Sequence, residues 1–339
     1  MNLLELNPRY IDPPNFGEWA TEEVRIIELH TGTYQDAVIQ TAYEGLNIKN
    51  MVTSDHVMSL INSLLSIRPF RRVDFTDCVI PNDSFKQLTN LLDHHMEILS
   101  LQDNTISVNE MEALFGFLNE HPFTETGFPL KTLIIKQPQI PNTLNWGILN
   151  QLKNLEIDSV SGVFSLAIIL ENLQENRSVE RLIIRNTLFN ENTIRSLVSL
   201  IIMNDTITEY VFENIQMDQE NAFLITNALV SNKRIQSLTI SHFIDDILPV
   251  LSLPAHLKIL IYETSKTTNI VEFFLRVRDY TTLQYLKYMT NDVVSDENVN
   301  WMISNVFVRN KSIVSFTYKD GMLSPFGYWS ITAQINYNM

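Results

Sequence analysis

The stretch RSVERLIIRNTLFN (residues 177–190) has an apolar spacing that a single helix does not explain. Leu182 and Ile184 are two residues apart, and Val179 precedes Leu182 by three. Two-residue alternation predicts a short strand with one buried face, and the apolar residue before it predicts a turn into that strand.

The same spacing recurs along the chain. The copies are FRRVDFTDCVI (70–80), MEILSLQDNTI (96–106), LKTLIIKQPQI (130–140), LKNLEIDSV (152–160), ITEYVFENIQM (207–217), IQSLTISHF (235–243), LKILIY (257–262), LQYLKYM (283–289), IVSFTY (313–318) and a weaker YEGLNIKNM (43–51). Their central positions are 22 to 34 residues apart. Between them lie helical patterns: NTIRSLVSLIIM places Ile194, Leu197, Val198 and Ile201 on one face. We therefore expect about eleven strand–turn–helix repeats that share one core when stacked.

A second marker has the same phase. Asn176, Asn204 and Asn232 are 28 residues apart, and each lies three residues before the apolar residue that opens the next copy, as does Asn310. An asparagine after a helix tolerates positive φ, so we expect left-handed helix caps here. Asn176, Asn204, Asn310 and Asn82 also match the glycosylation sequon, but the repeat explains their phase better.

These residues resemble the leucine-rich repeat, L-x-x-L-x-L-x-x-N/C-x-L. The copy at 96–106 matches this motif throughout, with Met96, Leu99, Leu101, Asn104 and Ile106. Cys78 takes the Asn/Cys place in the copy before it, whereas five other copies carry a different residue there: Pro138, Val160, Thr187, Ile215 and Phe243. Units of 26–30 residues are similar to the ribonuclease-inhibitor-like class.

The resemblance implies an α/β leucine-rich-repeat solenoid, or horseshoe, with a parallel concave sheet and convex helices. Repeats would span residues 43–319, between an N-terminal cap (1–42) and a C-terminal cap (320–339). We expect a helix at 33–43 and a protruding loop at 121–129, which is rich in proline. The C-terminal aromatic residues are expected to cover the end of the solenoid: Phe326, Tyr328, Trp329 and Tyr337.

The net charge and the cysteine content limit the kinds of partner and the cellular compartment that we expect. The 339-residue chain has 24 basic and 39 acidic residues, and 24 − 39 gives a net charge of −15. This charge disfavours nucleic acid and anionic membranes, and it favours a basic or mixed-charge protein partner. One cysteine excludes an internal disulfide and is typical of the cytoplasm. We see no signal peptide and no membrane-spanning run, and we expect a monomer in isolation.

The residues do not predict an enzyme. The seven histidines form no metal-ligand spacing, and no glycine-rich phosphate-binding motif occurs. Cys78 lies at a core-facing position, which favours a buried structural thiol over a nucleophile. We therefore expect no catalytic residue, no cofactor and no bound metal.

Side-chain alternation identifies the residues that point out of the concave face. A charged stripe crosses its middle, formed by Glu156, Asp158, Arg181, Arg185, Glu209 and Glu213. Apolar residues also fall on this outward row: Ile98, Ile134, Ile183 and Val211. The charges are compatible with a ladder of lateral salt bridges and with a stripe that aligns a partner, and the apolar line suggests a dry contact patch.

Two functions are compatible with this arrangement. The first is a non-catalytic scaffold or adaptor that binds a protein on the concave face. The second is a small-GTPase regulator, because the length and repeat type resemble the Ran GTPase-activating proteins. Those proteins carry a strongly acidic stretch after the repeats, whereas here Asp320 is the only acidic residue after Tyr318. This difference favours the scaffold.

Overall fold

The chain forms two compact units, Met1–Ser165 and Leu166–Met339. The structure is a computed structural model. It describes residues 4–7, 21–26, 38–42, 45–49, 72–79, 97–104, 106, 109, 111–113, 116, 130–136, 150–159, 163–242, 252–264, 270–290, 293–318 and 323–338. The predicted loop at 121–129 lies outside these residues.

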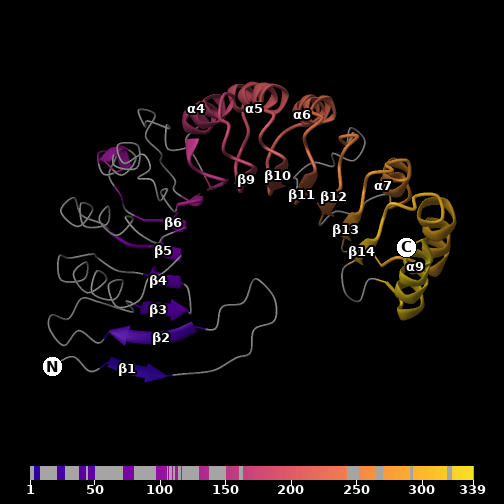
Figure 1. Cartoon of the computed structure of the whole chain (residues 1–339), viewed down its shortest axis with the longest axis horizontal. Coiled ribbons are helices and arrows are strands. Elements are labelled where there is room, and N and C mark those ends of the chain that lie inside the picture. Colours follow the sequence, from indigo (N-terminus) through magenta and orange to yellow (C-terminus); the bar gives the residue numbers. More distant parts are fainter. Residues whose placement is uncertain are drawn as a thin grey trace. The chain divides into compact units, whose positions relative to one another are not determined.

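In the first unit, antiparallel strands precede parallel ones (Figure 1). Adjacent members of the first group pair antiparallel in chain order: β1 (Leu4–Asn7), β2 (Thr21–Ile26), β3 (Val38–Ala42) and β4 (Gly45–Lys49). From β4 the pairing is parallel through β5 (Arg72–Thr76), β6 (Ile98–Gln102), β7 (Thr132–Lys136) and β8 (Asn154–Asp158). The prediction of a helix at 33–43 is wrong over Val38–Ala42, where β3 pairs with strands on both sides. The rest of that predicted helix lies outside the described residues.

In the second unit, all named strands are parallel and pair in chain order. They are β9 (Arg181–Arg185), β10 (Glu209–Glu213), β11 (Ser237–Ser241), β12 (Ile259–Glu263), β13 (Tyr285–Met289) and β14 (Ser315–Tyr318). The named helices, of which the first begins three residues before this unit, are α4 (Val163–Leu173), α5 (Glu191–Met203), α6 (Gln219–Ser231), α7 (Ile270–Val277), α8 (Asp296–Met302), the π-helix η3 (Ile303–Phe307) and α9 (Pro325–Asn338). Figure 1 shows α5 and α6 on the same side of β9–β11.

Every predicted copy of the apolar spacing contains a strand, and the first central apolar residue of the copy is the second residue of that strand. The strands pair level, so that Leu182, Tyr210 and Leu238 lie side by side. The protein is therefore an α/β protein with parallel strands paired in sequence order, which is consistent with a repeat solenoid.

The core lies on one face of these strands, as the alternation predicts. Leu182 and Ile184 are fully buried, and the helix face of α5 contributes Ile194 and Ile201, also buried. Val198, predicted to belong to that face, is half-buried. The repeats therefore share a continuous apolar layer between strands and helices.

In the first unit, the Asn/Cys place of the repeat works as a link between neighbours. The Asn104 Oδ1 accepts a hydrogen bond from the Cys78 amide at 2.9 Å, and its Nδ2 donates to the Phe75 carbonyl at 2.9 Å. Cys78 is fully buried, as predicted for a structural thiol, and its Sγ lies 3.4 Å from the Thr76 carbonyl.

The residue directly after several strands is left-handed. Positive φ angles between 50° and 56° occur at Asp77, Asp103, Ser159, Asn186, Asn214 and His242. Each of these side chains is polar, and asparagine and aspartate tolerate this region better than branched residues. This residue adds one more backbone hydrogen bond between neighbouring strands, because the Asn186 amide donates to the Glu213 carbonyl at 3.0 Å.

We predict that Asn186→Val destabilises the fold by about 1–3 kcal/mol, whereas Asn186→Gly costs much less. Both variants remove the exposed hydrogen bond that the Asn186 Oδ1 accepts from Asn214, so their difference isolates the φ of 50°. Urea unfolding followed by circular dichroism measures it. Equal stability of the two variants would show that the left-handed turn carries no strain.

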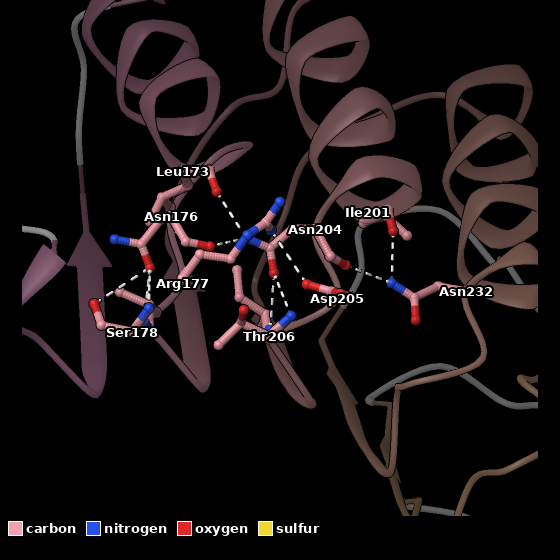
Figure 2. Close-up of polar contacts among 11 residues, drawn as sticks. Leu173, Asn176, Arg177, Ser178, Ile201, Asn204, Asp205, Thr206 and Asn232 are labelled. Carbon is pink, nitrogen blue, oxygen red and sulfur yellow. Dashed lines mark hydrogen bonds and ion pairs between the residues drawn. The ribbon is translucent and has the colours of Figure 1, made fainter.

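In several repeats of the second unit, a buried asparagine ties consecutive repeats together (Figure 2). The Asn204 Nδ2 donates to the carbonyls of Leu173 and Asn176, both at 2.8 Å, in the preceding repeat. Its Oδ1 accepts the amides of Thr206 at 2.8 Å and Ile207 at 2.9 Å. A single side chain thus satisfies a helix-end carbonyl of one repeat and the two amides that lead into the strand of the next.

The same bonds recur along the second unit. Asn232 Nδ2 donates to the Ile201 carbonyl at 2.6 Å and to the Asn204 carbonyl at 3.0 Å. Asn310 donates to the carbonyls of Val277 at 3.2 Å and Tyr280 at 2.9 Å. We call this row of side chains, with Asn176, the asparagine ladder.

The predicted left-handed caps are wrong. Asn204 and Asn232 end α5 and α6 with φ of −87° and −84°, in the extended region. Their side chains bond the preceding repeat instead of stabilising a local turn. Asn176, Asn204 and Asn310 are at most 2% exposed, so their amide nitrogens are inaccessible to a glycosyl donor in the folded chain.

Where a repeat has no asparagine at this place, other side chains form hydrogen bonds to the preceding repeat. Tyr280 lies in the equivalent place before β13, and its hydroxyl exchanges hydrogen bonds with both backbone groups of Leu253, at 3.1 and 3.0 Å. The Thr282 Oγ1 lies 2.9 Å from the carbonyls of Ala255 and Leu257. The requirement is therefore for a polar link between repeats rather than for asparagine itself.

We predict that Asn204→Ala lowers the free energy of unfolding by about 2–4 kcal/mol, because it leaves buried backbone groups without partners. Asn227→Ala is the matched control: Asn227 lies exposed on α6, and alanine there costs nothing or stabilises slightly. Chemical unfolding of both variants decides the matter. Similar small effects in the two would mean that the ladder contributes little.

The C-terminal aromatic residues do not cover the last repeat as predicted. Phe326, Tyr328, Trp329 and Tyr337 are between 50% and 87% exposed on α9. The buried face of this helix consists of Gly327, Ile331 and Ile335. Close packing explains the glycine, since a Cβ at Gly327 would lie 2.9 Å from a methyl group of Val299.

Candidate functional site

The first, third and fifth residues of each strand point to the sheet face opposite the core residues, which we call the open face. On β9 and β10 this face carries the predicted charged stripe. The register aligns Arg181 with Glu209 and Arg185 with Glu213. The first pair has an Nε–Oε1 distance of 2.9 Å, and the second has an Nε–Oε2 distance of 2.7 Å.

The lateral salt-bridge ladder is therefore confirmed between β9 and β10. All four side chains are about one-third to two-fifths exposed, so each pair contributes only about 0–1 kcal/mol to stability. Their charges neutralise one another across the strands. The stripe consequently presents alternating charge to solvent rather than a field of one sign.

The predicted apolar contact patch is wrong at its centre. Ile183 and Val211 are level neighbours on the open face, but they are only 4% and 5% exposed. We attribute their burial to the flanking arginine and glutamate side chains, whose methylene stems lie beside them in register. Ile98 and Ile134, in the first unit, are half-buried.

The remaining predicted site residues, Glu156 and Asp158, lie on β8 of the first unit. Both are half-buried, and the Asp158 Oδ1 accepts a hydrogen bond from the Ser159 hydroxyl at 2.7 Å. Their predicted proximity to Arg181 and Arg185 joins the two units and stays a prediction.

The open face of the first unit also pairs its charges. Arg72 bonds Asp74 on the same strand, with distances of 2.7 and 2.9 Å. Lys136 lies 3.2 Å from Asp103, and the hydrogen bond and attraction of that carboxylate raise the pKa of the lysine. Charge pairing between neighbouring repeats thus recurs in both units.

Sequence reasoning did not single out a second group on the open face of the second unit. Ile259, Ile261, Tyr285, Lys287 and Met289 adjoin one another on β12 and β13. Ile259 is 38% exposed and the others are half-buried. The sequence could have identified this group, because no acidic residue occupies the places level with Lys287 on the neighbouring strands.

Tyr210 differs from the other residues at its place in the repeat, which are aliphatic in most copies. It is fully buried, and its hydroxyl has no hydrogen-bond partner among the residues that the structure describes. Burial raises the pKa of this phenol well above its usual value. Burying the unpaired hydroxyl destabilises the folded state, and the packing of the ring in the core offsets this loss.

The described residues were compared with what a metal site or a membrane-spanning helix requires. Within them, no three histidine, cysteine, aspartate or glutamate side chains gather closely enough to hold a metal ion. Among the helices described, none has both the length and the apolar character needed to cross a bilayer.

No family model matches the chain, and a comparison with curated proteins finds no match.

We predict that Tyr210→Phe leaves stability at neutral pH unchanged or raises it by up to about 1 kcal/mol, because no hydrogen bond is lost. The unfolded chain releases the phenolic proton near pH 10, whereas the folded chain retains it, so wild-type stability falls as pH rises above about 10. The variant should lose less stability over this range.

Unfolding midpoints between pH 7 and 11 measure this difference, with Tyr328→Phe as the control because Tyr328 is half exposed. A parallel pH dependence for wild type and Tyr210→Phe would contradict the burial of an unpartnered phenol.

Proposed function

We propose that this chain is a leucine-rich-repeat protein of the ribonuclease-inhibitor-like class. The support is the repeated apolar spacing, the strand that coincides with each copy, and the helix between strands wherever one is described. The polar links at the Asn/Cys place, between Asn104 and Cys78, add to this assignment. Within this proposal, residues 1–42 and 320–339 cap the repeats.

The proposed function is that of a non-catalytic scaffold or adaptor that binds a protein on the open face. The observation that carries it is the level register of the strands, which aligns side chains from successive repeats into rows. The main-chain groups of the strands are engaged with neighbouring strands, so a partner is recognised by side chains. Rows of this kind form a broad recognition surface without any catalytic group.

The stripe on β9 and β10 suits a mixed-charge protein. Arg181 and Arg185 lie in one strand, with Glu209 and Glu213 in the next, so a partner gains most when its own charges alternate with the same spacing. Complementarity of this type determines orientation and association rate more than affinity. The proposed compartment is the cytoplasm, since the single cysteine is buried and reduced in the fold.

We predict that exchanging one pair, Arg185→Glu with Glu213→Arg, keeps the ion pair and changes stability by less than about 1 kcal/mol. Partner binding should fall about tenfold or more, because the order of charges facing the partner is reversed. Affinity capture from an extract of the source cell, with mass spectrometry and then calorimetry on the retained partner, measures the effect.

The matched control is Arg177→Glu with Asp205→Arg, since this pair joins the same two repeats at 3.2 Å but lies in the turns before the strands. The control should bind as wild type does. Unchanged binding by the first exchange would exclude the β9–β10 stripe as the contact surface.

A further inference from the structure

The open face of β12, β13 and β14 combines apolar side chains with one cation. Five of these side chains lie on β12 and β13, next to β14, and we call them the β12–β14 patch: Ile259, Ile261, Tyr285, Lys287 and Met289. In the register, Lys287 lies between Ile261 on β12 and Thr317 on β14. Tyr285 and Met289 flank it along its own strand. An ammonium group therefore sits at the centre of mostly apolar surroundings.

Lys287 differs from four other cations on the open face whose side chains the structure describes. Arg72, Lys136, Arg181 and Arg185 each have a carboxylate within 3.2 Å. In the part of the chain that the structure describes, Lys287 has no such partner.

The nearest acidic residue on these strands is already engaged. Glu263 lies two residues along β12 from Ile261, the residue level with Lys287. Its carboxylate oxygens lie 3.2 Å from the Ser241 hydroxyl and 3.2 Å from the His242 Nε2. On the other side, β14 offers Ser315 and Thr317, which carry no charge. The patch thus lacks an internal counterion for its lysine.

We propose that the β12–β14 patch binds an extended segment of a partner protein in which an acidic side chain is flanked by apolar residues two positions away on either side. The proposal rests on the function proposed above and identifies the chemistry of a partner segment. The carboxylate would pair with Lys287, and the flanking side chains would contact Tyr285 and Met289. Ile259 and Ile261 would widen the apolar contact.

The spacing of the patch favours an extended segment. Tyr285, Lys287 and Met289 alternate along one strand, so successive side chains are about 6.6 Å apart. Alternate side chains of an extended peptide repeat with the same spacing, whereas a helix presents neighbours three or four residues apart. An apolar–x–acidic–x–apolar segment therefore aligns with the three residues of β13.

The backbone argues for a side-chain carboxylate rather than a chain terminus. Capture of a terminal carboxylate uses free backbone amides. The β13 strand pairs with both β12 and β14, so its amides belong to the sheet. The net charge of −15 argues further against a highly acidic partner, since repulsion acts over about 8 Å at physiological salt. One carboxylate among apolar residues fits both limits.

Selection of displayed random peptides on the full chain tests this inference. We expect enrichment of aspartate or glutamate with apolar residues two positions on either side. Selection on Lys287→Glu should enrich lysine or arginine in the central place. Lys233→Glu, with the same charge change at an exposed position before β11, should select the wild-type motif.

Affinity measurements on one selected peptide complete the test. Lys287→Met should weaken its binding about tenfold, as loss of a charge-assisted hydrogen bond does, with an unchanged circular dichroism spectrum and melting temperature. Absence of an enriched motif, a helical spacing of the motif, or a motif that Lys287→Glu leaves unchanged would overturn the inference.

The same selection separates this inference from the proposed function. Peptides that bind Lys287→Glu normally but lose binding to the Arg185→Glu, Glu213→Arg exchange would exclude the patch and leave the open face as a binding surface. The scaffold function itself is judged by the captured protein partner.

Discussion

The hydrogen bonds of the asparagine ladder are the interaction on which the second unit depends. α5 ends close to the end of α4, and α6 ends close to the end of α5. Each of these helix ends carries carbonyls without a partner inside the helix. Burying such groups unpaired costs about 1–3 kcal/mol each. The Asn204 amide meets these carbonyls with its donors and the amides before β10 with its acceptor. One side chain therefore both holds its repeat against the preceding one and fixes where the next strand begins.

The level register is the consequence that matters for function. Because each link holds the start of a strand at the same height as its neighbour, the second residues of β9, β10 and β11 align in the core. The alternate residues must then align on the open face. The Arg185–Glu213 pair at 2.7 Å and the apolar neighbours of Lys287 on β12 are both products of this alignment. A recognition surface is thus built by the same constraint that stacks the repeats.

The sequence predicted where the parallel strands β4 to β14 lie, because two-residue alternation and the recurring phase are local patterns that the core enforces. It failed where distant partners decide. Asn204 was predicted to be left-handed from its local preference, but its bonds reach residues 28 and 31 positions earlier. The left-handed place is the residue after the strand instead, as at Asn186. At Val38–Ala42, pairing of β3 on both sides overrode a helical pattern.

The candidate site was predictable to a similar extent. Opposite charges at equivalent places in consecutive repeats were sufficient to predict the pairing of Arg181 with Glu209. The burial of Ile183 was not, because it depends on how far the neighbouring side chains extend over it. That no acidic residue lies level with Lys287 could have been predicted from the sequence, but its half-buried setting could not, because it depends on the packing of neighbouring side chains.

Native-state hydrogen exchange of individual amides tests the central claim most directly. The turn amides of Thr206, Ile207 and Arg234 donate to the oxygens of ladder asparagines. They should therefore exchange as slowly as amides within β10 and β11, although they lie outside any strand or helix. Exchange at the rate of an open loop would contradict an account in which asparagine side chains hold the repeats together.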